Sequence, residues 1–232
     1  MTREQNLSRF LDEIGHKHGP ITDYEPAIYY EFAFLRDAWH GIKANNVKRE
    51  LIEQFLPKGA LPSRSLDTPL AFNGHFGVAG KASNEHIQSP GKWSLTGFDG
   101  NVECNDAFRA TCLFKWAFNA KPDLVIQTAP NQCVCIEAKL DSGETSYPSS
   151  KGDKGVFKNR RLSHVRQTEV QSYLMNEILG FDADNILLSK HGRERSSFFR
   201  AVSWRTVLEA LSLERLPKHM KLSLKAKFDL KI

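Results

Sequence analysis

The sequence predicts an α/β protein, in which short β-rich runs are followed by helical segments. Residues 124–128 and 133–138 are two β-rich runs joined by a turn that contains Pro130 and Asn131, so they predict a β-hairpin. A helical pattern over residues 163–179 follows and is closed by Gly180. A further strand and helix then come in alternation, and the α/β prediction rests on this succession.

The C-terminal part continues the alternation. Residues 186–189 and 197–202 are short apolar runs of the kind that forms strands. Residues 204–213 predict a helix, with Ser203 as its N-cap. The lysine-rich tail from Lys218 onward fits either a strand or a frayed end.

The N-terminal part predicts helices. Residues 1–19 carry a short amphipathic pattern that stops at Gly15, and residues 47–56 carry a second helical pattern. Residues 25–39 predict a longer helix with Pro26 in its first turn. Its apolar side chains recur at helical spacing: Ile28, Phe32, Leu35 and Trp39.

Three stretches are less regular. Residues 57–101 are rich in proline, glycine and serine and predict a loop with short strands, while residues 141–163 are polar and basic with little periodicity. Residues 107–118 are apolar and fit either a strand or a helix. We therefore expect an N-terminal helical region with an irregular insertion over residues 1–104, packed on a core over residues 105–232 as one domain overall.

Composition excludes several classes of protein. Of the 232 residues 41% are hydrophobic and 25% are charged, which is globular usage and excludes a disordered or fibrous chain. No window approaches the ~18 apolar residues of a membrane helix, and the polar N-terminus lacks the apolar core of a secretion signal. We expect a cytoplasmic protein with no membrane partner. Four cysteines without a C-x-x-C pair give no support for a disulfide scaffold or a zinc finger.

Three charged residues decorate the predicted hairpin. Asp123 begins its first strand, while Glu137 and Lys139 end its second and, being two apart, point to the same face. If the turn is centred at Pro130, residues whose numbers add up to 260 lie opposite each other, and 123 plus 137 is 260. Directly opposed residues are about 5 Å apart at Cβ, so two carboxylates and an ammonium converge at one end of the hairpin.

Opposed carboxylates favour a divalent cation between them. Like charges directly across a sheet are destabilising, and a cation turns that cost into coordination. Mg²⁺ suits oxygen ligands and takes only one or two carboxylates from a protein. A lysine beside the metal can stabilise developing phosphate charge or orient a water. The alternative interpretation is a solvated Glu–Lys pair at a surface hairpin end.

The motif resembles the signature of the PD-(D/E)XK phosphodiesterase superfamily, the restriction-endonuclease-like nucleases. Pro122–Asp123 is followed after thirteen residues by Glu137–Lys139, and the resemblance covers roughly residues 105–213. The family core is a mixed central β-sheet flanked by helices, in the order helix, three-strand meander, helix, strand. The hairpin, the 163–179 helix and the 186–189 strand occur in that order.

The resemblance implies roles for the motif residues. Asp123, Glu137 and the main-chain carbonyl of Ala138 would bind Mg²⁺, with Mn²⁺ as a substitute, and Lys139 would be the catalytic lysine. Several branches also place a glutamine on the following helix, often as Q-x-x-x-Y. Gln167 and Gln171 lie on the apolar stripe of that helix, where a buried amide needs a partner, although the spacing to Tyr173 differs. Solvated helix glutamines are the alternative.

Many members carry a further acidic ligand on the first core helix. Glu31 lies among the apolar residues of the 25–39 pattern and is our candidate, with Glu25 and Glu103 as competitors. A surface glutamate is the alternative for each.

A basic segment follows the signature. Its side chains predict a mobile loop that holds phosphates and supplies salt-dependent affinity for nucleic acid, a solvated loop being the alternative. The candidate contacts are Lys151, Lys154, Lys158, Arg160, Arg161 and Arg166. A formal net charge of +5 permits such a polyanionic partner without requiring it.

The leading hypothesis is a Mg²⁺-dependent endonuclease that hydrolyses phosphodiester bonds in DNA. Two alternatives belong to other classes: a non-cleaving nucleic-acid-binding or assembly module on a nuclease-derived fold, and a non-nuclease protein with a chance E-x-K. RNA or single strands as substrate, attack from an end, and a homodimer as the cutting form stay open.

Overall fold

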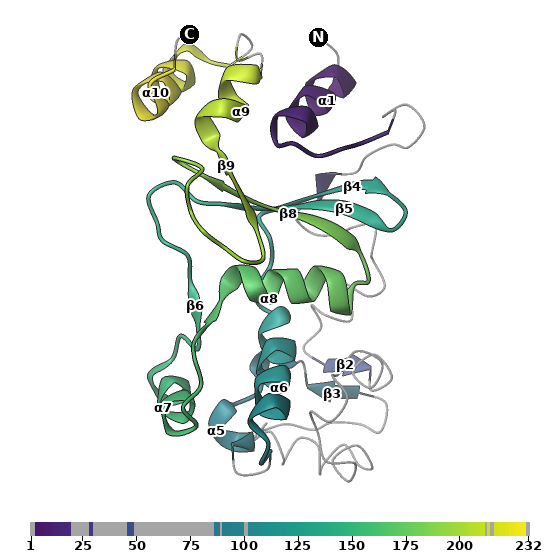
Figure 1. Cartoon of the computed structure of the whole chain (residues 1–232), viewed down its shortest axis with the longest axis vertical. Coiled ribbons are helices and arrows are strands. Elements are labelled where there is room, and N and C mark those ends of the chain that lie inside the picture. Colours follow the sequence, from purple (N-terminus) through teal and green to yellow (C-terminus); the bar gives the residue numbers. More distant parts are fainter. Residues whose placement is uncertain are drawn as a thin grey trace. The chain divides into compact units, whose positions relative to one another are not determined.

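The computed structural model describes residues 3–19, 28–29, 46–48, 86–88, 90–99, 102–211, 213 and 216–230 (Figure 1). The chain divides into two compact units, each described by itself. The first comprises Met1–Tyr30, Pro122–Glu144 and Phe181–Ile232, and the second comprises Glu31–Lys121 and Thr145–Gly180. None of the helices in these described ranges is long and apolar enough to cross a membrane.

The first unit is built on a mixed sheet of five strands in the order β1-β4-β5-β8-β9. The strands are β1 (Ile28–Tyr29), β4 (Leu124–Ala129), β5 (Gln132–Ala138), β8 (Asp182–Ser189) and β9 (Arg200–Ser203). The pairs β1–β4 and β4–β5 are antiparallel, whereas β8 runs parallel to β5 and β9 parallel to β8. The α/β prediction and the mixed sheet are therefore confirmed.

The hairpin has the register that its turn predicts. Leu124 pairs with Ile136 and Gln127 pairs with Cys133, so the paired residue numbers add up to 260. The register shifts only at the turn, where Ala129 pairs with Gln132. Continuing the ladder by one residue places Asp123 opposite Glu137.

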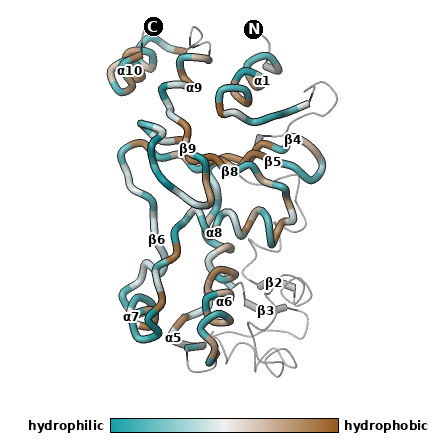
Figure 2. Tube along the Cα trace, viewed as in Figure 1, coloured by the Kyte–Doolittle hydropathy of each residue, from teal (hydrophilic) through white to brown (hydrophobic). Residues whose placement is uncertain are grey.

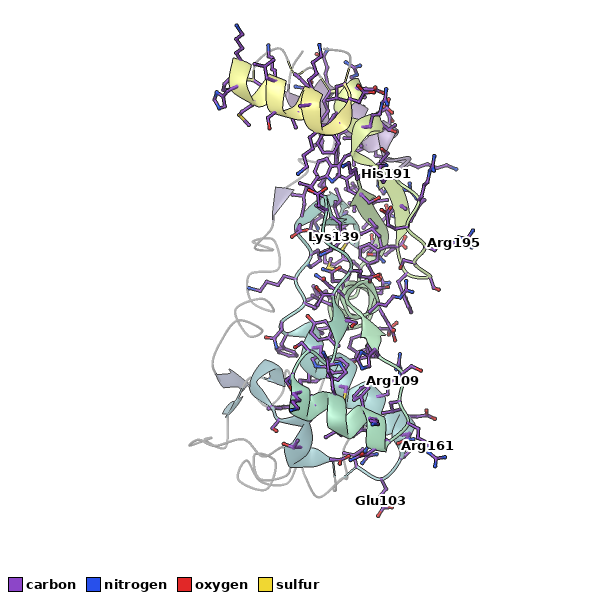
Figure 3. The ribbon with its side chains drawn as sticks, turned by 90° about the vertical axis from the view of Figure 1, so that its left-hand side faces the viewer. Glu103, Arg109, Lys139, Arg161, His191 and Arg195 are labelled. Carbon is purple, nitrogen blue, oxygen red and sulfur yellow. The ribbon has the colours of Figure 1, made fainter. Side chains whose placement is uncertain are left out.

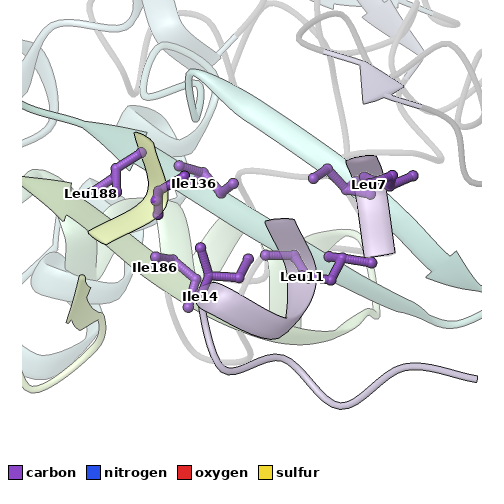
Figure 4. Close-up of a cluster of buried hydrophobic side chains, with 9 residues drawn as sticks. Leu7, Leu11, Ile14, Ile136, Ile186 and Leu188 are labelled. Atoms are coloured by element: carbon purple, nitrogen blue, oxygen red, sulfur yellow. The ribbon is translucent and has the colours of Figure 1, made fainter. Parts of the chain in front are cut away.

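Helices α1 (Arg3–Glu13) and α9 (Trp204–Ala210) cover one face of this sheet. The apolar residues of α1 recur at helical spacing and pack on the strands, as Figure 4 shows for Leu7, Leu11, Ile14, Ile136, Ile186 and Leu188. Hydrophobic colour is concentrated along β5 and β8 in Figure 2. Because side chains alternate along a strand, Glu137 lies on the opposite face from its neighbour Ile136.

Helix α10 (Lys218–Phe228) completes the first unit. Its end contacts α9 through Phe228, whose ring lies 6.3 Å from that of Trp204. The lysine-rich tail is therefore a helix, neither the strand nor the frayed end that we considered. Its C-cap is Asp229, which has φ 52°.

The second unit is mainly helical. Its helices and turns are η4 (Pro90–Lys92), α5 (Leu95–Phe98), α6 (Asn105–Ala117), α7 (Lys151–Asn159), α8 (Gln167–Tyr173) and a π-helical turn, Leu174–Ile178. Two short strand pairs accompany them: β2 (Asn46–Lys48) with β3 (His86–Gln88), and β6 (Ser146–Tyr147) with β7 (Val165–Arg166). Its core is aromatic: the ring of Trp116 is stacked on that of Tyr147, with centres 5.1 Å apart, and is tilted against that of Phe157 at 5.5 Å.

Two of the predicted N-terminal helices are wrong at the residues that the structure describes. Ile28 and Tyr29 pair with Ile126 and Val125, so the start of the 25–39 pattern is a strand. Isoleucine and tyrosine favour strands, and pairing with the hairpin overrides the local helical spacing. Val47 likewise lies in β2 and not in a helix. The remaining residues of both patterns lie outside the described residues.

In other segments the structure decides between predicted alternatives, corrects a predicted element or confirms it. The apolar 107–118 stretch is helical: it lies in α6 up to Ala117, and Phe118 is the C-cap of that helix. The stretch expected to be a mobile basic loop contains α7, which begins where the Ser150 hydroxyl accepts a hydrogen bond from the Asp153 amide, and which buries Val156 and Phe157. The helix expected from residue 163 begins at Gln167, because Val165 and Arg166 pair with β6. The hydroxyl of Ser203 caps α9 as predicted.

Candidate active site

The main chain around Lys139 is fixed from two directions within the first unit. Its amide donates to the carbonyl of Leu188 at 2.8 Å, which continues the parallel pairing of β5 with β8. Its carbonyl accepts a hydrogen bond from the indole Nε1 of Trp204 at 3.1 Å. The main chain at the end of β5 is therefore held in place by hydrogen bonds on both sides of Lys139, which Figure 3 labels.

Asp123, Glu137 and Lys139 lie at the same end of the hairpin, as the register predicts. The Asp123 carboxylate reaches across the hairpin, where its Oδ2 accepts a hydrogen bond from the amide of Ala138 at 2.8 Å. The Glu137 carboxylate pairs with Lys139, with Oε1 and Nζ 2.5 Å apart. The side chain of Glu137 is 2% exposed and that of Lys139 18%, whereas Asp123 is exposed. One carboxylate is thus buried against an ammonium, and the other faces solvent.

Two cysteines share the strand face of Glu137. Burial raises the pKa of the Cys135 thiol well above its ordinary value, and the charges of Glu137 and Asp123 raise it further. Burial likewise raises the pKa of Cys133 to about 12. Both thiols stay protonated near neutral pH, so they fill space beside the carboxylates and do not act as nucleophiles.

We expect one of the four thiols to react rapidly with a disulfide reagent such as DTNB in the native protein. Cys104 is exposed, whereas Cys112, Cys133 and Cys135 are buried. The thiolate is the reactive form, and burial raises the pKa of each of these three thiols. The check is the stoichiometry of thiol release, with all four reacting in concentrated guanidinium chloride. Rapid native release of any thiol in Cys104→Ser would contradict the burial.

The donor set at the hairpin end suits a hard divalent cation. Asp123 and Glu137 offer carboxylate oxygens, and the Ala138 carbonyl directly follows Glu137 in sequence. Within the described ranges, no group of three or more His, Cys, Asp and Glu side chains is arranged to hold a metal. A site with two carboxylates fits Mg²⁺, which keeps several waters, better than Zn²⁺, which takes three or four protein ligands.

The two helix glutamines lie in the second unit. Gln171 is fully buried, and its Nε2 donates to the main-chain carbonyl of Lys121 at 3.0 Å. The expectation that a glutamine on the apolar side needs a partner is therefore confirmed for Gln171. Gln167 is half-buried at the first turn of α8. A role of either residue in catalysis stays a prediction.

The upstream acidic candidates are not placed at the carboxylates. Glu31 and Glu25 lie outside the described residues. Glu103 is an exposed residue of the second unit, where its main-chain carbonyl accepts a hydrogen bond from Arg160 at 3.4 Å. The third acidic ligand therefore stays a prediction.

The predicted phosphate contacts divide into two groups. Five are exposed: Lys151, Lys154 and Lys158 on α7, Arg161 after it and Arg166 in β7 (Figure 3 labels Arg161). The sixth, Arg160, has a side chain only 13% exposed. Its guanidinium binds the segment before α6 and the first residue of that helix, through Asp99, Val102, Glu103 and Asn105. Arg160 therefore holds the second unit together, and we remove it from the nucleic-acid candidates.

Replacing Arg160 with alanine is expected to destabilise the protein by about 2 kcal/mol, because several charge-assisted hydrogen bonds are lost at once. The guanidinium also lies 4.1 Å from the centre of the Phe108 ring. Arg160→Lys should recover less than half of the loss, since an ammonium cannot reproduce the planar fork. Urea unfolding measures both, with exposed Lys154→Ala as the matched control. Equal stability of the Arg160 and Lys154 variants would contradict this role.

One residue at the site was not found from the sequence. Trp204 donates to the carbonyl of Lys139 across a separation of 65 residues. It was singled out only as the first residue of a helix, and no local pattern links a helix start to a distant strand end. The one signal in the sequence that could have indicated this contact is the tryptophan itself, because a buried indole N–H usually donates to a hydrogen-bond partner.

Comparison of the chain with protein-family models, with curated proteins and with solved structures finds no match. The resemblance to a nuclease family therefore rests on the motif residues and on the order of the elements around them.

Proposed function

We propose that this chain is a divalent-metal-dependent nuclease that hydrolyses phosphodiester bonds in DNA, on a restriction-endonuclease-like core of the PD-(D/E)XK kind. The observation that carries the proposal is the convergence of Asp123, Glu137 and Lys139 at one end of the β4–β5 hairpin. The Asp123 carboxylate contacts the amide of Ala138, and Glu137 contacts Lys139. Two opposed carboxylates, with an ammonium two residues along the same strand, are groups suited to phosphodiester hydrolysis assisted by a metal ion.

The order of the elements supports the proposal. Along the chain α1, β1, β4, β5, α8 and β8 follow the succession helix, three strands, helix, strand. The three strands are antiparallel neighbours, and β8 returns parallel to β5. The segment between β1 and β4 is then an insertion into this core.

Each residue has a definite part in the proposed reaction. Asp123, Glu137 and the Ala138 carbonyl would hold Mg²⁺ or Mn²⁺. When bound, the ion would supply the Lewis-acid chemistry that polarises a phosphate and lowers the pKa of a water. The ammonium of Lys139, which is paired with Glu137, would bind the attacking water or the phosphate oxygens as their charge grows. Gln167 and Gln171 are the candidates for positioning these groups.

Digestion of supercoiled plasmid by the purified protein tests the proposal. We expect nicking or linearisation with Mg²⁺ or Mn²⁺ and none with EDTA. Single-stranded DNA and RNA in parallel reactions identify the substrate class. Absence of metal-dependent cleavage of all these substrates would remove the proposal and leave a non-cleaving binding module as the better description.

A further inference from the structure

A pocket of about 300 Å³ opens in the first unit where β8 and β9 end. We call it the basic pocket; its polar lining is Lys190, His191, Arg193, Ser203, Arg205 and Lys227. The buried ring of Phe228 and the carboxylate of Asp229 complete it. Its volume lies at the lower end of the range for small-molecule sites, which are mostly apolar. This lining is mainly cationic instead, so the pocket favours anionic ligands.

The lining carries a surplus of positive charge. The lining contains one carboxylate, that of Asp229, and four cationic side chains: Lys190, Arg193, Arg205 and Lys227. Within the part of the chain that the structure describes, the side chains of His191 and Arg193 form no hydrogen bond or ion pair (Figure 3 labels His191). Their donors are therefore available to a ligand.

The turn that carries these side chains is already ordered. Gly192 has φ +63°, and a Cβ there would lie 2.8 Å from the amide nitrogen of Ser203, so only glycine allows this approach to β9. The Ser189 hydroxyl accepts from the Gly192 amide at 2.9 Å, and the Glu194 carboxylate accepts from the Arg193 amide at 3.0 Å. A ligand would not have to order this turn, which favours binding.

The internal counter-ions of the pocket are weakly held. Asp141, two residues after Lys139, lies 3.1 Å from the Nζ of Lys227 and 3.8 Å from that of Lys190. A hydrogen bond from Lys227 and the charges of both lysines keep the pKa of Asp141 below its ordinary value. Its side chain is 66% exposed, and exposed Lys–carboxylate pairs contribute little. Arg205 is likewise paired on the surface with Glu209, at 2.9 Å. A ligand of higher charge can displace such partners.

We propose that the basic pocket binds a phosphate group, with Arg193, Lys190 and Lys227 as its cationic donors and Ser203 as a neutral one. The oxygens of a phosphate group accept several charge-assisted hydrogen bonds at once, and the group carries more negative charge than the single carboxylate of Asp141. The phosphate can belong to a nucleic-acid backbone or to a free polyphosphate, because both present the same group. This site needs neither a metal nor cleavage, so it goes beyond the proposed nuclease activity.

Binding in EDTA tests the site with two probes, inorganic triphosphate by calorimetry and a fluorescent oligothymidylate by anisotropy. Arg193→Ala and Lys227→Ala should each weaken binding about 10-fold, the loss of one charge-assisted contact. Lys225→Ala is the matched control, an exposed lysine on the same helix outside the pocket. Asp141→Asn should tighten binding several-fold, because it removes the competing carboxylate.

The outcomes separate the sources of the phosphate. Displacement of the oligonucleotide by triphosphate supports a backbone site, and binding of triphosphate alone supports a free polyphosphate. Failure of the wild type to bind either probe would overturn the proposal, as would equal binding by the Arg193, Lys227 and Lys225 variants. Since metal is absent throughout, a failure of plasmid cleavage leaves this test unaffected, and a failure here leaves the carboxylate site unaffected. Thermal unfolding of each variant checks that these exposed substitutions preserve the fold.

Discussion

Asp123→Asn is expected to lower the rate of metal-dependent plasmid cleavage at least about 100-fold, since even indirect partners of a metal ligand often change activity by 10- to 100-fold. Asparagine keeps the size of the side chain and an oxygen that can accept the hydrogen bond from the Ala138 amide. It removes the negative charge that the proposed cation requires. The fold should be unchanged, because Asp123 is exposed. The rate of nicking at several Mg²⁺ concentrations measures the effect.

A second variant, at a carboxylate away from the hairpin end, tests whether the loss of any exposed negative charge would have the same effect. Asp182 is another exposed aspartate of the same unit, where it begins β8. Asp182→Asn should cleave at the wild-type rate and have the same thermal midpoint as Asp123→Asn. Equal rates for the two variants, at equal stability, would show that Asp123 does not hold the metal, and the assigned site would lose its main support.

The carboxylate pair was predictable because it depends on local geometry. The two strands are joined directly, so a turn centred at Pro130 fixes which residues are opposed, and alternation fixes the face. The observed pairing of Leu124 with Ile136 is the consequence of both. The irregularity at Ala129 lies next to the turn and does not propagate to Asp123. Strong local signals also predicted α1 and α9, which have an apolar stripe and a capping serine.

Elements that depend on distant partners could not be found in this way. Ile28 pairs with Ile126, almost a hundred residues away, and this pairing decides between strand and helix. Arg160 was counted with its basic neighbours, yet its partner Asp99 lies 61 residues before it. The sequence alone does not show whether a charged side chain is bonded within the protein or free to contact a ligand. That depends on which backbone carbonyls tertiary packing places next to it.

Two further features had signals in the sequence that were not used. Ser150 precedes Asp153 by three residues, a spacing typical of a helix start, and predicts α7 within the basic stretch. The run from Lys190 to Arg195 contains three Lys or Arg residues and one histidine immediately after a strand. A basic turn at the end of a buried strand is a place where a sheet presents donors to an anion. The turn becomes a pocket only because Gly192 lets it approach β9.

The pair formed by Glu137 and Lys139 leads to the second prediction of large effect. Lys139→Met should destabilise the protein by about 3 kcal/mol, the lower part of the range for breaking a buried ion pair. Methionine preserves the length of the side chain but removes the ammonium from a carboxylate that is 2% exposed. Glu137→Gln should cost less, because the Lys139 side chain is 18% exposed and can turn toward water. Urea unfolding in EDTA measures both free energies.

The double variant, Glu137→Gln with Lys139→Met, distinguishes a broken charge pair from lost packing. If the loss in Lys139→Met comes from the buried charge, removing that charge as well should recover most of the stability, so the double variant should be more stable than Lys139→Met. If packing of the lysine stem is the cause, the two losses add. Mg²⁺ provides an independent measure, since a cation bound only to the folded state adds about 2.7 kcal/mol at a hundred times its dissociation constant. A gain from Mg²⁺ in Lys139→Met that disappears when Asp123→Asn is added would place the cation between the two carboxylates.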